Sequence, residues 1–118
     1  MGDVEAALRS AAEELQPEIQ RRLSGFLGGL IRAYLPQAWV FRTEAETVTL
    51  RVDATGRVTV APGPDAKPDV TVEIPWSRLR VALAQRRREA VPPGPLTVTP
   101  HTAKGKAAFD YLRGRLGL

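Results

Sequence analysis

Apolar residues recur at helical spacing along the first 36 positions of the chain. The first stripe faces a charged side and predicts an amphipathic helix of about 13 residues, formed by Val4, Ala7, Leu8, Ala11, Ala12 and Leu15. A proline suits the first turn of a helix, so Pro17 predicts the start of a second one. The second stripe ends before Pro36 and consists of Ile19, Leu23, Phe26, Leu27, Leu30 and Tyr34. The pattern therefore predicts two successive helices.

From residue 38 the apolar positions alternate with polar ones, which is the period of two that predicts strands. Four such segments follow one another, at 39–43, 48–52, 58–60 and 70–74. Gly56 lies in the short link between the second and third segments and predicts a tight hairpin turn with a positive φ. Clean alternation is typical of an antiparallel sheet with one face on a core and the other in water.

A shorter helical stripe follows Pro75 and is formed by Trp76, Leu79, Ala82 and Leu83. A proline-rich connection then leads to a fifth strand at 96–99. Thr102 predicts the N-cap of a last helix, whose stripe holds Gly105, Phe109, Leu112 and Leu116. The predicted order is ααββββαβα. A chain of 118 residues is long enough for one core, so we expect a single domain over residues 1–118.

The residue types present exclude several kinds of chemistry. The chain has no Cys and a single His, so thiol nucleophiles and thiolate metal sites are excluded, and a histidine-built metal site or triad nearly so. His101 follows the fifth strand, where a lone histidine is more often a capping or surface residue. Asp69 and Glu73 lie along one strand and favour a structural or solubility role. We therefore expect no catalytic residues, no metal and no cofactor.

Charge is distributed unevenly along the chain. Residues 1–75 carry 8 Lys and Arg against 11 Asp and Glu, a net −3, whereas residues 76–118 carry 9 against 2, a net +7. The basic segment at 76–118 suggests an anionic partner, such as nucleic acid or a membrane surface. The alternative is that it forms only a solvated basic surface. The basic run at 86–88 has no interleaved aromatic residues, which disfavours base-specific nucleic-acid binding.

The composition also bears on where the protein works. No apolar run reaches the length of about 20 residues that spans a bilayer, and the first residues lack a signal-peptide pattern, so a cytoplasmic protein is expected. The chain has no Asn and no Cys, and its prolines fall mostly between the periodic segments. These features fit a thermophilic source.

The apolar stripes can be buried in two ways. They can pack into a solid core, or they can leave an apolar cavity between helices and sheet of the kind that small ligands use. Periodicity cannot distinguish the two, and composition alone favours the solid core.

Several segments, in their order and spacing, resemble the sterol carrier protein type 2 family of lipid-binding domains. They are the Trp-Val-Phe strand at 39–41, the hairpin at 53–56, the acidic and alternating strand at 68–74 and the segment at 94–99. The last stands where family members carry a Gly-Lys-Leu-Lys-Ile strand before a final amphipathic helix. The resemblance implies an α+β fold in which helices cover one face of a five-stranded, mostly antiparallel sheet, with an apolar tunnel between the layers.

The resemblance also implies the ligand class and the site. Family members bind sterols, fatty acids, acyl-CoA esters or phospholipids without covalent chemistry. The expected lipid-binding residues are Phe26, Leu27, Leu30, Trp76, Leu79, Leu83, Phe109, Leu112 and Leu116, and the apolar face of the sheet completes the expected lining. Contacts with anionic head groups or with a membrane surface are expected at Arg86, Arg87, Arg88, Lys104 and Lys106.

Two departures from the family pattern lie near the expected tunnel mouth. Residues 86–93 replace an Asn-Pro-x-x-Ala-Phe stretch, and Pro100 and His101 stand where Gly-Asn or Gly-Asp usually follows the strand. The identity of the ligand therefore stays open. The last three residues, 116–118, are not the peroxisomal tripeptide of eukaryotic members, which fits a cytoplasmic prokaryotic protein.

Together these observations predict a noncatalytic lipid-binding or lipid-transfer module. Its predicted partners are an apolar small molecule and, peripherally, an anionic membrane. One alternative is a solid-cored module that binds a protein or assembles with itself, for example as a homodimer. The third and less favoured hypothesis is a nonspecific nucleic-acid-binding protein.

Overall fold

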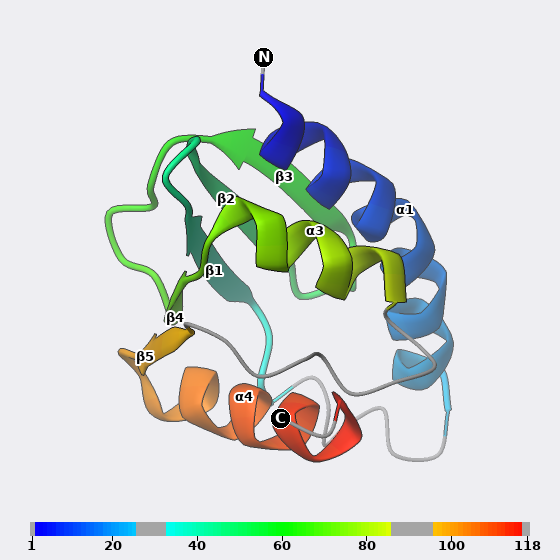
Figure 1. Ribbon diagram of the computed structural model, residues 1–118. Coiled ribbons are helices and arrows are strands. Elements are labelled where there is room, and N and C mark those ends of the chain that lie inside the picture. Colours follow the sequence, from blue (N-terminus) through cyan, green and yellow to red (C-terminus); the bar gives the residue numbers. More distant parts are fainter. Residues whose placement is uncertain (1, 26–32, 86–95, 117–118) are drawn as a thin grey trace.

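The computed structural model describes residues 2–25, 33–85 and 96–116, apart from the side chains of 84, 85 and 111–116. Its helices are α1 (Asp3–Leu23), α3 (Trp76–Gln85) and α4 (Ala103–Leu116) (Figure 1). Its strands are β1 (Gln37–Arg42), β2 (Thr47–Val52), β3 (Val58–Pro62), β4 (Val70–Glu73) and β5 (Thr97–Pro100). The described part therefore has the order αββββαβα.

Helix α1 continues through Pro17, so the predicted helix break at this residue is wrong. The two apolar stripes are in phase and form one continuous face, made by Val4, Leu8, Ala12, Leu15, Ile19 and Leu23. A proline inside a helix costs about 3 kcal/mol because its N–H is missing and its ring crowds the preceding turn. Pro17 is exposed, so its ring faces away from the sheet, and burial of the continuous stripe outweighs the cost.

The strands form one five-stranded sheet in the order β3-β2-β1-β4-β5, which confirms the predicted mostly antiparallel sheet. The pairs β1–β2, β2–β3 and β4–β5 are antiparallel, and β1 pairs in parallel with β4. The predicted hairpin between β2 and β3 is also confirmed, since Gly56 has φ +86° and its N–H bonds Asp53 O at 3.0 Å.

The alternating pattern predicted that the outer face of the sheet is in water, but part of this face is covered. β4 lies beside β1 rather than beside β3, so the connection between β3 and β4 has to cross β2 and β1. It buries Val40 to 2% and Thr49 to 1% exposure on that face. Thr49 Oγ1 donates to Gly63 O at 2.8 Å, and Arg51 pairs with Asp65 at 2.6 Å. These contacts fix the crossing segment over the middle of the sheet.

Two hydrogen bonds lower the pKa of Asp65 in this segment from its usual value. Its carboxylate accepts the backbone N–H of Lys67 at 2.8 Å and the Arg51 Nε–H at 2.8 Å. The Lys67 hydrogen bond, and after it the Arg51 hydrogen bond, lower the pKa of Asp65 because both stabilise the charged form.

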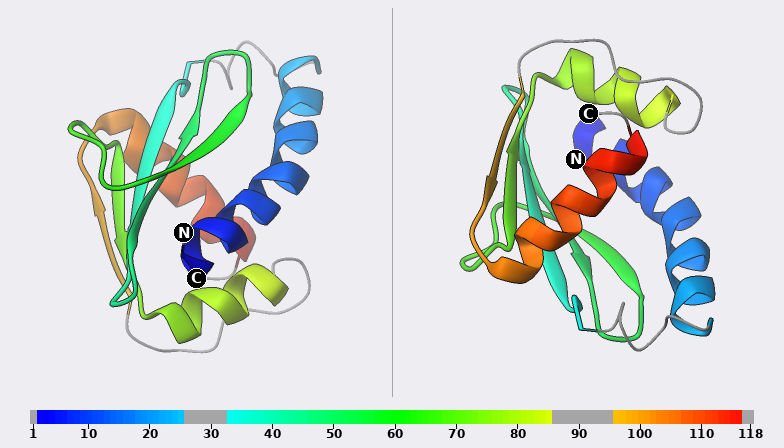
Figure 2. Two further views of the ribbon diagram at one scale, coloured as in Figure 1. Left: turned by 90° about the horizontal axis from the view of Figure 1, so that it is seen from above. Right: turned by 90° about the horizontal axis from the view of Figure 1, so that it is seen from below.

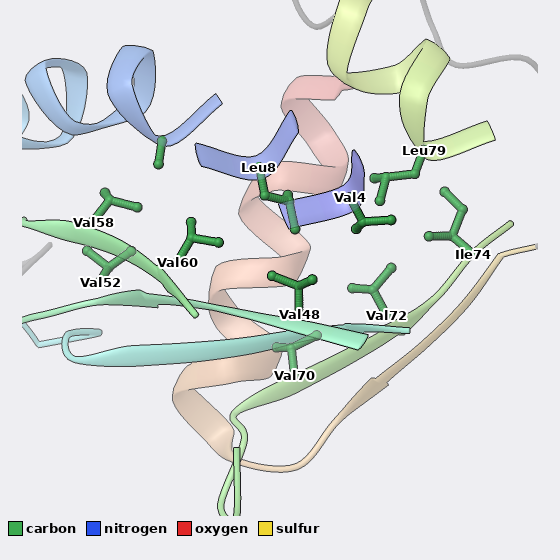
Figure 3. Close-up of a cluster of buried hydrophobic side chains, with 11 residues drawn as sticks. Val4, Leu8, Val48, Val52, Val58, Val60, Val70, Val72, Ile74 and Leu79 are labelled. Atoms are coloured by element: carbon green, nitrogen blue, oxygen red, sulfur yellow. The ribbon is translucent and has the colours of Figure 1, made fainter. Parts of the chain in front are cut away.

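The three described helices lie on the other side of the sheet (Figure 2). α1 packs along β2 and β3, α3 packs chiefly against α1, and α4 packs against β4 and β5. The apolar core fills the space between α1, α3 and the sheet (Figure 3). Its buried members include Val4, Leu8, Val48, Val58, Val60, Val70, Val72, Ile74 and Leu79. The prediction of a sheet covered on one face by helices is therefore confirmed.

Two positive-φ glycines provide a matched test of how α1 packs at its C-terminal end. Gly56 and Gly63 have φ values of +86° and +87°. A Cβ on Gly56 would lie 2.7 Å from Leu23 Cδ1, whereas a Cβ on Gly63 would have no neighbour within 4 Å. Gly63→Ala should therefore lower the free energy of unfolding by about 1 kcal/mol, from backbone strain alone. Gly56→Ala should lower it by roughly 2 to 3 kcal/mol, because the packed side chain of Leu23 must also move. Urea denaturation measures both, and equal losses would contradict the packing contact.

Candidate apolar binding site

Three side chains in the middle of the sheet face the helices and yet stay partly exposed. Trp39 and Phe41 of β1 and Leu50 of β2 are only half-buried. Trp39 is paired with Leu50 across one ladder and with Val70 across the other, so the floor shares its face with the buried core. Helix-facing positions of inner strands are normally buried, as Val70 is at 0% exposure. These three residues, hereafter the aromatic floor, form an apolar surface beside the closed core.

Helix α4 adds a third ring to this surface. The ring centroids of Trp39 and Phe41 are 6.5 Å apart, as are those of Trp39 and Phe109 from α4. The indole Nε1–H of Trp39 donates to Gln37 Oε1 at 2.9 Å. Because the only polar atom of the indole is satisfied by a neighbour, its ring offers apolar area to whatever lies against it.

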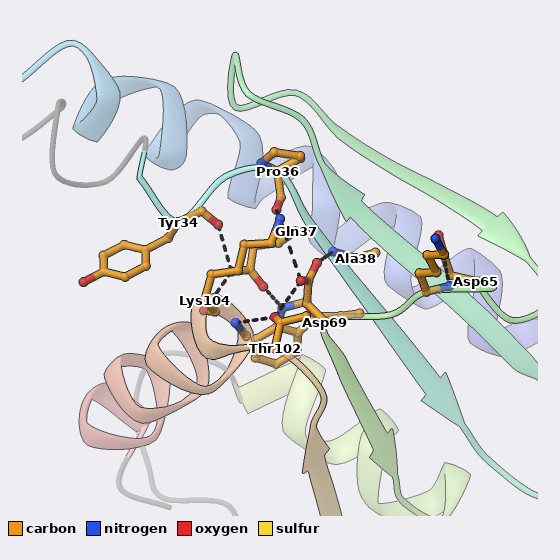
Figure 4. Close-up of polar contacts among 11 residues, drawn as sticks. Tyr34, Pro36, Gln37, Ala38, Asp65, Asp69, Thr102 and Lys104 are labelled. Atoms are coloured by element: carbon orange, nitrogen blue, oxygen red, sulfur yellow. Dashed lines mark hydrogen bonds and ion pairs between the residues drawn. The ribbon is translucent and has the colours of Figure 1, made fainter.

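A polar cluster fixes the start of α4 against the sheet (Figure 4). We call Gln37, Asp69, Thr102 and Lys104 the Asp69 clasp. Asp69 is 6% exposed, and its carboxylate accepts the N–H of Ala38 at 2.9 Å and the hydroxyl of Thr102 at 2.7 Å. Lys104 Nζ lies 3.7 Å from the same carboxylate. The clasp thus joins α4 to β1 and to the residue that precedes β4.

Gln37 completes the clasp from the sheet side. It is 5% exposed, and its side-chain amide donates to Tyr34 O at 2.8 Å and to Lys104 O at 2.9 Å. All the hydrogen-bonding groups of this amide are therefore used, since its oxygen accepts from Trp39. Gln37 orients the indole and the first turn of α4 at the same time.

The first turn of α4 comes very close to the sheet. Thr102 Oγ1 accepts the N–H of Gly105 at 3.0 Å, which confirms the predicted N-cap. Gly105 is buried, and a Cβ at this position would collide with the carbonyl oxygen of Asp69. Only glycine allows this approach, which places the helix so that Phe109 reaches Trp39.

The described residues show no arrangement suited to metal chemistry or to membrane spanning. They contain no group of three or more His, Cys, Asp or Glu residues that could hold a metal ion. No helix in the described ranges has the length and apolar character to cross a bilayer. His101 lies at the surface, where its Nε2 is 2.9 Å from Thr71 Oγ1.

No family model matches the chain, and no curated protein does. Solved structures do match it over nearly its whole length. A ubiquinone synthesis protein, UbiJ-SCP2, is 16% identical, with 97% of this chain and 96% of that chain covered and a TM-score of 0.50. This chain has a sterol-carrier-protein-2-like fold. We abbreviate it as the SCP2-like fold.

Two further solved structures are similar to this chain at lower TM-scores. Sterol Carrier Protein 2 Like 2 from Aedes aegypti is 20% identical, with coverage of 89% of this chain and 98% of that chain and a TM-score of 0.46. The sec-alkylsulfatase Pisa1 from Pseudomonas sp. is 22% identical, with 69% of this chain covered and a TM-score of 0.47. This chain spans only 13% of the length of that enzyme.

The SCP2-like fold brings some of the predicted lipid-binding residues together and separates others. Phe109 contacts the aromatic floor, and Trp76 and Leu83 pack half-buried against the core. Leu79 is 4% exposed and belongs to the closed core. The side chains of Leu112 and Leu116 lie outside the described part, as do Phe26, Leu27 and Leu30 altogether, so these five stay predictions.

Of the residues predicted to contact a head group, some lie within the described part of the chain and others lie outside it. Arg86, Arg87 and Arg88 lie outside the described residues. Lys104 donates to Pro36 O at 2.6 Å, in addition to its ion pair in the clasp. Lys106 pairs with Asp110 at 3.0 Å across one turn of α4 and is otherwise open to solvent. A head-group contact at these positions stays a prediction.

The family resemblance placed the apolar face of the sheet in the tunnel lining, but sequence reasoning did not single out the three residues of the aromatic floor or the clasp. The alternating pattern identified Trp39, Phe41 and Leu50 as strand residues. Their partial exposure depends on the tertiary packing of the helices over the sheet. The expected structural role of Asp69 is confirmed, whereas its partners are 31 and 33 residues away in sequence. The local signals were an aspartate directly before a strand and a threonine at a helix start.

Proposed function

We propose that this chain is a noncatalytic lipid-binding or lipid-transfer domain. The apolar part of a fatty acid, acyl-CoA ester or sterol-like molecule lies against Trp39, Phe41 and Leu50, with α4 along one side. The observation that carries the proposal is the partial exposure of these three side chains on the helix-covered face of inner strands. Apolar area that the fold leaves uncovered is available to an apolar ligand, and each buried CH₂ contributes about 0.8 kcal/mol.

The SCP2-like fold supports the same proposal. The solved structures with this fold include sterol carrier proteins by name, and one is a ubiquinone synthesis protein. A sec-alkylsulfatase contains a similar segment, so the fold also occurs within an enzyme. We assign no reaction to this chain, because its sequence has no cysteine and a single histidine, which the structure places at the surface.

We propose that the predicted residues of α3 and α4 complete the lining, and that basic residues of the C-terminal part contact an anionic head group or membrane surface. Lys106 is a described residue that is accessible for this contact, since its side chain is 68% exposed. The proposed location is the cytoplasm.

The aromatic floor can be tested by displacement of a fluorescent fatty acid and by native mass spectrometry. Trp39→Ala should weaken binding at least about 10-fold, since a large buried apolar side chain contributes roughly 1.5 to 3 kcal/mol. Val81→Ala is the matched control, because Val81 is an exposed apolar residue on α3 and should leave the affinity unchanged.

Two results would contradict the proposed function. One is a folded wild-type chain that neither carries nor displaces any lipid. The other is equal affinity for the wild type and Trp39→Ala. If light scattering of the lipid-free chain also gave the molar mass of a tight dimer, the self-assembly hypothesis would be favoured instead.

A further inference from the structure

A buried amide lies on the helix-covered face of the sheet, among apolar neighbours. Gln37 is the first residue of β1, and the strand register places it opposite Val52 on this face. Gln37 is 5% exposed and Val52 is 7% exposed. A buried amide costs free energy unless its polar groups have partners. Gln37 is therefore compatible with this position only through its hydrogen bonds.

The partners of this amide fix its orientation. Nε2 of Gln37 donates to Tyr34 O at 2.8 Å and to Lys104 O at 2.9 Å (Figure 4). Its Oε1 accepts the indole N–H of Trp39 at 2.9 Å. A backbone carbonyl can only accept and an indole N–H can only donate, so the amide cannot be turned over without losing all three bonds. The network therefore allows one orientation of Gln37 and holds the indole of Trp39 by its N–H.

The same bonds connect the two sides of the proposed ligand site. Trp39 belongs to the aromatic floor, and Lys104 lies in the first turn of α4, whose Phe109 ring centroid is 6.5 Å from that of Trp39. The one polar atom of the indole is bonded to Gln37, so it is not offered to a ligand. A ring and a helix that one fixed side chain holds keep their arrangement without ligand, which lowers the cost of ordering them on binding.

We propose that Gln37 is a positioning residue of the apolar site, which does not touch the ligand and raises its affinity by holding the Trp39 indole and the start of α4 in the arrangement that the ligand meets. The ligand part of this proposal rests on the proposed function. The other part, the hold of Gln37 on the indole, is measurable without any lipid.

The indole N–H signals in the NMR spectrum test the hold on Trp39. The chain has two tryptophans, so Trp76 supplies an internal reference, and the Trp39 signal is the one that Trp39→Phe removes. Gln37→Met removes the acceptor and should speed exchange of the Trp39 indole proton with water about 5-fold, as expected for one lost hydrogen bond. Gln37→Glu keeps an acceptor oxygen and should leave this exchange close to that of the wild type. An unchanged Trp39 signal in Gln37→Met, or equally fast exchange in both variants, would overturn the proposal.

Displacement of a fluorescent fatty acid tests the ligand step. Gln37→Met should weaken binding about 5-fold under conditions in which the variant is fully folded. Thr49→Val is the matched control, because Thr49 is 1% exposed and the substitution also removes a hydrogen bond of a buried side chain, on the opposite face of the sheet. This control should leave the affinity unchanged. In Trp39→Phe, which has no indole N–H, Gln37→Met should weaken binding by less than it does in the wild type.

The affinities also define what would contradict the positioning role. Equal affinity of the wild type and Gln37→Met would overturn it, even with a changed indole signal. An equal loss of affinity in Gln37→Met and Thr49→Val would overturn it as well, because the loss would then report lower stability alone. If the wild type binds no lipid, the proposed function fails and the ligand part fails with it, and the exchange experiment alone decides whether Gln37 holds the indole.

Discussion

Replacing Asp69 by alanine should lower the free energy of unfolding by about 3 kcal/mol and release the start of α4 from the sheet. The substitution removes the acceptor of the Ala38 N–H and of the Thr102 hydroxyl and leaves Lys104 without its carboxylate. A hydrogen bond to a charged group contributes about 1.5 to 3 kcal/mol, and a buried donor left without a partner costs a similar amount. Urea denaturation measures the loss, and hydrogen exchange locates it in the first turn of α4.

Two further variants distinguish the loss of the clasp hydrogen bonds from the loss of a negative charge as the cause of the lower stability. Asp69→Asn keeps an acceptor oxygen and should lose less than half as much stability. Asp65→Ala removes an aspartate that is only partly buried and pairs with Arg51 on the opposite face, so it should cost less than about 1 kcal/mol. If all three variants lost the same stability, the clasp would not be what fixes α4.

The second large effect is expected in the closed core. Leu8→Ala should lower the free energy of unfolding by about 3 kcal/mol, because Leu8 is 1% exposed and its truncation leaves a cavity among Val4, Val48 and their neighbours. The substitution slightly favours the helix itself, so the loss reports packing alone.

Leu15→Ala is the control on the same helix. Leu15 is partly exposed at the edge of the core and should lose roughly half as much or less. Because both variants exchange leucine for alanine within α1, the difference between them measures burial. Equal losses would show that the closed core does not end where the side-chain exposures place it.

Much of the fold followed from local patterns in the sequence. The strand segments, the hairpin at Gly56 and the N-cap at Thr102 are set by neighbouring residues, and the structure confirms each of them. The break predicted at Pro17 was wrong because a local rule was applied where tertiary burial dominates. The stripe on either side of Pro17 is buried against the same two strands.

The sequence by itself determined the strands, most of the helices and an antiparallel sheet with one face on a core, and it excluded thiol chemistry, because periodicity and composition are local properties. That helices cover one face of the sheet was implied by the family resemblance. Only the tertiary structure decided which apolar residues are closed off and which stay partly exposed. The burial of Val40 and Thr49 depends on a connection that crosses the sheet, and the joining of Asp69 to Thr102 depends on strand order. Trp39 meets Phe109 across 70 positions of the chain. Pairings of this length are fixed by topology, and no window of neighbouring residues contains both partners.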